Sequence, residues 1–263
     1  MLRKLLKYEF KATGRLLFPL YIVLIAFSFI NKLFMGDILT SETPSFLGEL
    51  PRVLSMIMYI ATMVAIFVVT FFITAQRYYK NLLGDEGYLM NTLPVKTWQN
   101  IASKLIVAIV WSIASVFVAI VSVLIMAYEK GVLTELFKDI PMVFSDLYTQ
   151  AGMSGYLIII QVILLLLISY ASAILMVYAS ISLGHLFNKR KILCSFGAYI
   201  VLSMVSQTLA AVCATPFIGV VNTMDPINLV NLVLLLVNIG NIVLGVAYFI
   251  TCNYITKNKL NLE

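Results

Sequence analysis

Charged residues are scarce in this sequence. Of its 263 residues, 11% are Asp, Glu, Lys or Arg and 62% are hydrophobic, whereas water-soluble domains are about 25% charged. So little charge cannot hydrate the surface of a soluble globule. The composition excludes that class and predicts an all-α, polytopic membrane protein.

The sequence also has few of the residues that site chemistry needs. It holds one histidine, His185, so the chain cannot form a two-histidine metal site, and we interpret this residue as interfacial. It has no G-x-x-x-x-G-K-[ST] phosphate loop and does not bind ATP by that route. On the span assignment below, every charged residue falls in an arm, loop or tail. This distribution counts against ion coupling through intramembrane charges.

Cysteine is rare too, and its positions argue against disulfides. Cys194 and Cys252 are expected at the inner surface and Cys213 inside a span, so no pair faces an oxidising compartment. The N-terminus imitates a signal peptide, but FINKLFMGD lacks a small-x-small cleavage site. The N-terminal segment is therefore expected to be retained.

Long apolar runs, in contrast, are plentiful. A helix needs about 20 apolar residues to cross roughly 30 Å of hydrocarbon. The predicted spans are residues 16–34, 53–76, 105–127, 155–184, 195–220 and 229–251. Pro19 is expected in the first turn of the first span, where its missing amide is tolerated. The chain then divides into an interfacial helix over residues 1–15 and a single six-span domain over 16–263.

The distribution of Lys and Arg predicts the orientation. Five of the 18 lie in the N-terminal arm, four in residues 77–104, three in 185–194 and two in the C-terminal tail, which leaves four for the opposite side. Cytoplasmic segments retain Lys and Arg, so both termini are expected in the cytoplasm. The net charge of +6 then reflects this bias and attraction to anionic membrane lipid, and no nucleic-acid partner is expected.

Two segments outside the spans have an amphipathic pattern. In residues 1–15 the five basic residues fall on one helical face and the leucines with Phe10 on the other. This pattern predicts a helix lying on the inner leaflet, with a flexible basic tail as the alternative. The outer loop, residues 128–154, has a similar pattern, which fits a helix on the outer leaflet or a packed loop helix.

Small and amide side chains inside the spans predict helix packing. In the fourth span the small residues are Ser169, Ser172, Ala173, Ala179, Ser180 and Gly184. In the sixth, Asn231 and Asn238 are seven residues apart and so lie nearly above one another. Such amides either bond across helices or line a polar path.

The longest polar interruption on the expected cytoplasmic side is residues 77–104, RYYKNLLGDEGYLMNTLPVKTWQNIASK. Its first Tyr and Leu residues recur at helical spacing, so the second span is expected to continue until Gly84 ends it with a left-handed cap. The short apolar stretch between Gly87 and Pro94 is interpreted as a compact apolar projection, here called the knob, that contacts a cytoplasmic partner. The alternative is a capped helix pair that only connects two spans.

This layout resembles the permease subunit of the type-2 ABC exporter family, in particular the compact six-span permeases of Gram-positive bacteria. The resemblance rests on the basic helix KLLKYEFKATGRLL that runs into the first span, on the 77–104 loop and on the total length. In that family this loop forms a coupling helix that docks into a separate ATP-hydrolysing subunit. The positions that match the ATPase-coupling loop are Gly84, Asp85, Glu86, Gly87, Tyr88, Leu89 and Met90.

The resemblance implies a transport subunit, not an enzyme. Its substrate would be an amphipathic or apolar compound, such as a drug, an antimicrobial peptide or a lipid-like molecule. ATP and Mg²⁺ would bind to a dimer of ABC-type ATPase subunits, and a second copy or a related permease would complete the transporter in a bacterial plasma membrane. The short outer loop, residues 221–228, departs from the re-entrant insertion of some relatives, which counts against lipid or sterol substrates.

Spans two and five face the dimer axis in similar permeases, and this gives a candidate substrate path. The polar residues on it are Thr62, Thr70, Ser206, Gln207 and Thr208. Two other functions stay open. One is a non-transporting membrane scaffold or assembly factor, and the other is an ion-coupled secondary carrier.

Overall fold

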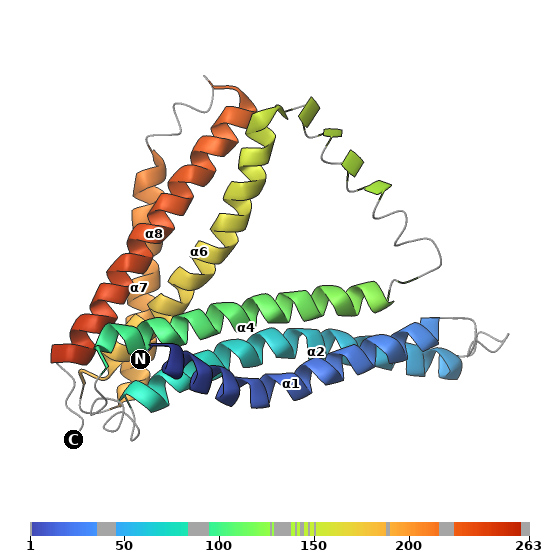
Figure 1. Cartoon of the computed structure of the whole chain (residues 1–263), viewed down its shortest axis with the longest axis horizontal. Helices are drawn as coiled ribbons and strands as arrows, with labels where there is room; N and C mark the ends of the chain where they lie inside the picture. Colours follow the sequence, from blue (N-terminus) through green and yellow to red (C-terminus); the bar gives the residue numbers. More distant parts are fainter. Residues whose placement is uncertain are drawn as a thin grey trace. The chain divides into compact units, whose positions relative to one another are not determined.

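Helices account for the regular structure in the part of the chain that the computed structural model describes (Figure 1). That part is residues 2–35, 46–83, 95–126, 128, 138–139, 141–142, 145–146, 148–149, 151–187, 190–215 and 224–258. The elements are α1 (Leu2–Met35), α2 (Phe46–Tyr78), η1 (Tyr79–Leu83), α4 (Thr97–Met126), α6 (Met153–Gly184), α7 (Lys191–Ala214) and α8 (Pro226–Asn258). These described residues hold no strand, and the all-α prediction is confirmed.

Six of these helices are long and apolar enough to cross a membrane, so the protein is a multi-pass membrane protein as predicted. The candidate spans are Leu2–Leu33, Val53–Leu83, Thr97–Met126, Met153–Gly184, Lys191–Ala214 and Pro226–Asn258. Each overlaps one predicted span. Most of the helices extend past the predicted edges, because a helix continues into polar sequence that a count of apolar residues leaves out. Residues 216–220 of the predicted fifth span lie outside the described part.

The first helix joins the basic arm to the first span. The boundary placed at residue 15, between the interfacial helix and the six-span domain, falls inside α1, a continuous helix of 34 residues. At 1.5 Å per residue it is about 51 Å long, more than the roughly 30 Å of hydrocarbon. The basic residues of the arm are exposed and Phe10 is half-buried, in line with the two predicted faces. Pro19 lies deep inside the helix and not in its first turn, so it leaves one helical hydrogen bond unmade.

The chain forms two compact units, each described here by itself. The first unit consists of Met1–Thr74 and Ile106–Asp139, and the second of Ala75–Leu105 and Ile140–Glu263. The first contains α1 with the larger parts of α2 and α4, and the second contains α6, α7 and α8. The unit boundaries therefore fall inside α2 and α4.

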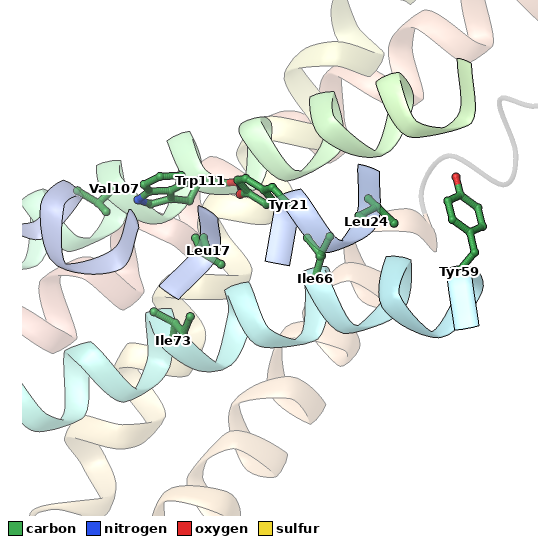
Figure 2. Packing of buried hydrophobic residues seen from close by; sticks show 8 residues of the cluster. All are labelled: Leu17, Tyr21, Leu24, Tyr59, Ile66, Ile73, Val107 and Trp111. Carbon is green, nitrogen blue, oxygen red and sulfur yellow. Dashed lines mark hydrogen bonds between the residues drawn. The ribbon is translucent and has the colours of Figure 1, made fainter. Parts of the chain in front are cut away.

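The core of the first unit is an apolar cluster shared by three helices (Figure 2). Its members are Leu17, Tyr21, Leu24, Tyr59, Ile66, Ile73, Val107 and Trp111. Phe18 meets the indole of Trp111 edge-on at 5.6 Å between ring centres. Gly14 makes room for this indole, because a Cβ at residue 14 would be 3.2 Å from it.

Hydroxyl groups add polar ties inside this apolar unit. Tyr21 of α1 and Thr70 of α2 both bond the hydroxyl of Ser115 on α4, at 2.9 and 3.2 Å. Asn31 and Ser55 form a reciprocal pair between α1 and α2, with 3.0 Å from the Asn31 Nδ2 to the Ser55 carbonyl and 3.0 Å from the Ser55 Oγ to the Asn31 Oδ1. Where no water competes, each such bond fixes the register of one helix against another.

In the second unit, α6 packs against both α7 and α8. Three hydrogen bonds join α6 and α8 at one constant offset of 77 residues. The Asn231 Nδ2 donates to the Ser154 carbonyl at 3.3 Å, the Asn238 Nδ2 to the Gln161 carbonyl at 3.1 Å, and the Cys252 Sγ to the Leu175 carbonyl at 3.9 Å. A constant offset means that the two helices run parallel without slipping. Contacts seven residues apart are typical of coiled-coil packing.

The buried seam of α8 follows the same seven-residue repeat. Asn238, Gly245 and Cys252 are all buried. On α6, four of the predicted small residues are buried: Ser172, Ala179, Ser180 and Gly184. Of the two roles left open for the amides, Asn231 and Asn238 take the first, because each bonds across to α6.

Asn238→Ala is expected to destabilise the protein by about 1 kcal/mol, the usual worth of an interhelical hydrogen bond in a membrane. Asn241→Ala is the matched control, because Asn241 is half-buried and bonds the Val237 carbonyl of its own helix. Unfolding in mixed micelles titrated with SDS measures both. Equal effects of the two changes would mean that the Asn238 bond does not hold α6 and α8 together.

Candidate functional site

The seven residues assigned to the ATPase-coupling loop, Gly84 to Met90, lie outside the described part of the chain. The segments on either side of them are described up to Leu83 and from Val95. Both flanks belong to the second unit, together with α6, α7 and α8. The loop is therefore anchored at both ends to the same group of helices.

The approach to the loop is helical, as the sequence predicts. After α2 ends at Tyr78, the chain continues as the π-helix η1 through Leu83. Asn81, Leu82 and Leu83 are all buried. The π-helical turn itself was not predicted, because no residue spacing indicates one. Such turns are rare in proteins, and many of those known lie at functional sites.

The last residue of α2 is held by a cluster that we call the Tyr78 node, made of Tyr78, Tyr178 and Ser182. The Tyr78 and Tyr178 rings are stacked, with centroids 4.0 Å apart and planes 7° from parallel. The Tyr78 hydroxyl shares a 2.7 Å hydrogen bond with the Ser182 hydroxyl. Tyr178 and Ser182 are four residues apart on α6, so they present one face to Tyr78.

No local sequence pattern predicts this node. A tyrosine at the end of a span is usually an interfacial anchor, and nothing local to Tyr78 marks it as fully buried. The available signal was the Tyr-x-x-x-Ser spacing on α6, which places an aromatic ring and a hydroxyl together near the C-terminal end of an apolar helix. The groups of the node bind by stacking and hydrogen bonding, so they hold helices in place and do not supply acid–base chemistry.

His185 lies beside this cluster, immediately after α6. Its ring centre is 5.2 Å from that of Tyr79, and its Nδ1 is 2.8 Å from the Ile181 carbonyl. Burial lowers the pKa of His185, and nearby Lys191 lowers it further, against the opposing effect of the Ile181 carbonyl. The ring is therefore neutral at pH 7, and in that form Nδ1 donates its proton to the carbonyl. Within the described residues, no group of three His, Cys, Asp or Glu is placed to hold a metal ion.

Lys104 lies inside α4, where its side chain is buried. The sequence allows Thr97 to cap the helix of the third span, and α4 begins there. Lys104, counted with the 77–104 segment, is therefore about two turns inside that helix. Its exposed fraction is only 6%.

The five candidate path residues fall into two groups. Thr62 and Thr70 belong to the first unit, and the other three lie on α7 in the second. Thr62 bonds the Met58 carbonyl of its own helix at 2.7 Å. Thr70 is buried and bonds both the Ile66 carbonyl and Ser115, so its hydroxyl is already used to pack three helices.

The α7 residues are more open. Ser206 is half-buried, and Gln207 and Thr208 are exposed. The Ser206 and Thr208 hydroxyls bond carbonyls of their own helix. None of the α7 side chains is buried in this chain.

Comparison of the chain with protein-family models, curated proteins and solved structures gives no match.

Proposed function

We propose that this chain is the membrane subunit of an ATP-driven exporter of the type-2 ABC family. It moves an amphipathic or apolar compound across the membrane when a separate ATPase subunit is bound. Six apolar helices, the resemblance in the 77–104 segment and the lack of a phosphate loop in the sequence support this proposal. The energy for transport through such a chain must come from a separate protein that hydrolyses ATP.

The observation that carries the proposal is the way the loop is anchored. A coupling element has to transmit displacement, so its flanks must be continuous with the spans and firmly packed. Here α2 continues into η1 without a break, and three of the five η1 residues are buried. Both flanks also belong to one compact unit. A merely connecting loop does not require such anchoring.

The partners follow from the mechanism. A dimer of ABC-type ATPases binds ATP and Mg²⁺, and a second copy of this chain or a related permease pairs with this chain within the membrane. Gln207 favours a protein neighbour at α7, because an amide exposed to hydrocarbon loses its hydrogen bonds. The complex resides in a bacterial plasma membrane with both termini in the cytoplasm.

Affinity purification of the tagged chain from its native membranes tests the proposal. An ATP-hydrolysing protein is expected to co-purify in near-stoichiometric amount. Transport that depends on an ion gradient and needs no such partner would instead support an ion-coupled carrier. If neither an ATP-hydrolysing partner nor transport is detected, the result would instead support a membrane scaffold.

The orientation is tested by introduced cysteines. We expect an impermeant thiol reagent, applied to sealed cells, to label positions outside and spare those inside, because of the asymmetry of Lys and Arg. The outside positions are Ser41, Asp146 and Asn222, and the inside positions are Asp85, Asn188 and Asn258. Labelling at position 85 in sealed cells would contradict the orientation.

A further inference from the structure

Tyr78 is the point where the loop joins the body of the second unit. Its exposed fraction is 0% and that of Tyr178 is 1%. The Tyr178 ring stacks on the face of the Tyr78 ring, and Ser182 hydrogen-bonds the Tyr78 hydroxyl. A residue held in two directions cannot shift without moving α6.

The same hydroxyl also reaches α8. It lies close enough to the side chains of Thr256 and Cys252 to interact with them. The Thr256 Oγ1 donates to the Cys252 carbonyl at 2.7 Å, and the Cys252 Sγ bonds the Leu175 carbonyl of α6 at 3.9 Å. The end of α2 is therefore placed beside the seam between α6 and α8.

Only η1 separates this node from residue 84. That element is five residues long, and its last three residues are buried. Tyr79, its first residue, lies against His185 at the end of α6. Packed protein interiors shift as units and do not deform continuously. A displacement of the loop would therefore pass through η1 to Tyr78 with little loss.

We propose that the Tyr78 node is a joint that converts movement of residues 84–94 into movement at the α6–α8 seam. The inference rests on the proposed function, since the ATPase supplies the movement. Tyr78 acts as a positioning residue, with Tyr178 and Ser182 as its seat on α6. The Tyr78 hydroxyl is what extends the joint to α8.

A native thiol reports on this seam. Cys252 is completely buried, whereas Cys194 is half-buried and Cys213 is exposed. In a Cys194→Ser, Cys213→Ser background, Cys252 is the only thiol. Its rate of labelling by membrane-permeant N-ethylmaleimide is measured in the complex with the co-purified ATPase. Nucleotide-free complex is compared with complex trapped by ATP and vanadate.

We expect the labelling rate of Cys252 to differ about fivefold or more between the two states, the lower end of usual allosteric coupling. Tyr78→Phe keeps the ring and removes the hydroxyl. It is expected to abolish this difference while the ATPase still co-purifies and hydrolyses ATP. Tyr254→Phe is the matched control, because Tyr254 is two residues from Cys252 on α8 and 55% exposed. It is expected to keep the full difference.

The outcomes separate the joint from the proposed function. If Cys252 reacts at one rate in both states with the ATPase bound, or if Tyr78→Phe keeps the full difference, the joint is refuted and the exporter stands. If no ATP-hydrolysing protein co-purifies, the proposed function fails first and the joint with it. Should Tyr78→Phe not fold, Ser182→Ala removes the 2.7 Å bond from the other side and is expected to abolish the difference equally.

Discussion

Gly184→Ala is expected to destabilise the protein by about 3 kcal/mol, which is at the upper end of the usual cost of overpacking. A Cβ at this position would be 2.5 Å from the Ser195 backbone nitrogen and 2.6 Å from the Ser195 Cα. Backbone atoms cannot rotate away as a side chain can, so the end of α6 would have to separate from the start of α7. The thermal midpoint should fall by roughly 5–10 °C, measured by size-exclusion chromatography of heated, detergent-solubilised protein.

Gly197→Ala controls for the loss of a glycine. Gly197 lies on α7, two residues from Ser195, and a Cβ there would meet nothing within 4 Å. Because alanine is the better helix former by up to about 1 kcal/mol, this variant should be as stable as the wild type or slightly more so. Wild-type stability of Gly184→Ala would mean that α6 and α7 are not as close as described.

Leu89→Asp is expected to abolish binding of the ATPase without unfolding the chain. If residue 89 makes an apolar contact with the partner, a buried carboxylate costs several kcal/mol, and each ~1.4 kcal/mol is tenfold in affinity. Met90→Asp should act in the same way. The double change of Asp85 and Glu86 to alanine should leave the chain folded, because surface substitutions usually change stability by about 0.5 kcal/mol or less. It should nonetheless weaken binding of the ATPase or break the link between hydrolysis and export, less severely than Leu89→Asp.

Co-purification of the ATPase with each variant measures these effects. Asn258→Asp is the control for added charge, because it places one carboxylate at the exposed end of α8, on the expected cytoplasmic side. It should retain the ATPase fully. If Leu89→Asp retains it as well and transport is intact, the knob has been assigned to the wrong residues.

The sequence predicts the fold because each span is long and continuously apolar. The seven-residue spacing of Asn231 and Asn238 could also have predicted that α8 packs along one face against another helix. The position of Pro19 was harder, because α1 continues through polar residues that hydropathy assigns to an arm. The start of α4 followed from Thr97 as a capping residue, but the burial of Lys104 did not follow from any local pattern.

The site could be predicted only in outline. The helical spacing that leads up to Gly84 predicted the extension that ends at Leu83. The Tyr78 node could not be predicted, because it joins Tyr78 to residues about 100 positions away, and no local pattern relates α2 to α6. Thr70 shows the converse limit. It is polar and suitably placed for a path, yet its hydroxyl is used by Ser115.

Photo-crosslinking from the loop is the sharpest test of whether this chain binds an ATPase there. A benzophenone amino acid replaces Leu89 in the full-length chain, and cells are irradiated before their membranes are dissolved. The account predicts a crosslink to an ATP-hydrolysing protein from position 89, and no such crosslink from Asn222 on the expected outer side. A chain that crosslinks to no ATPase from positions 85, 89 or 90, or that does so equally from position 222, would contradict the account.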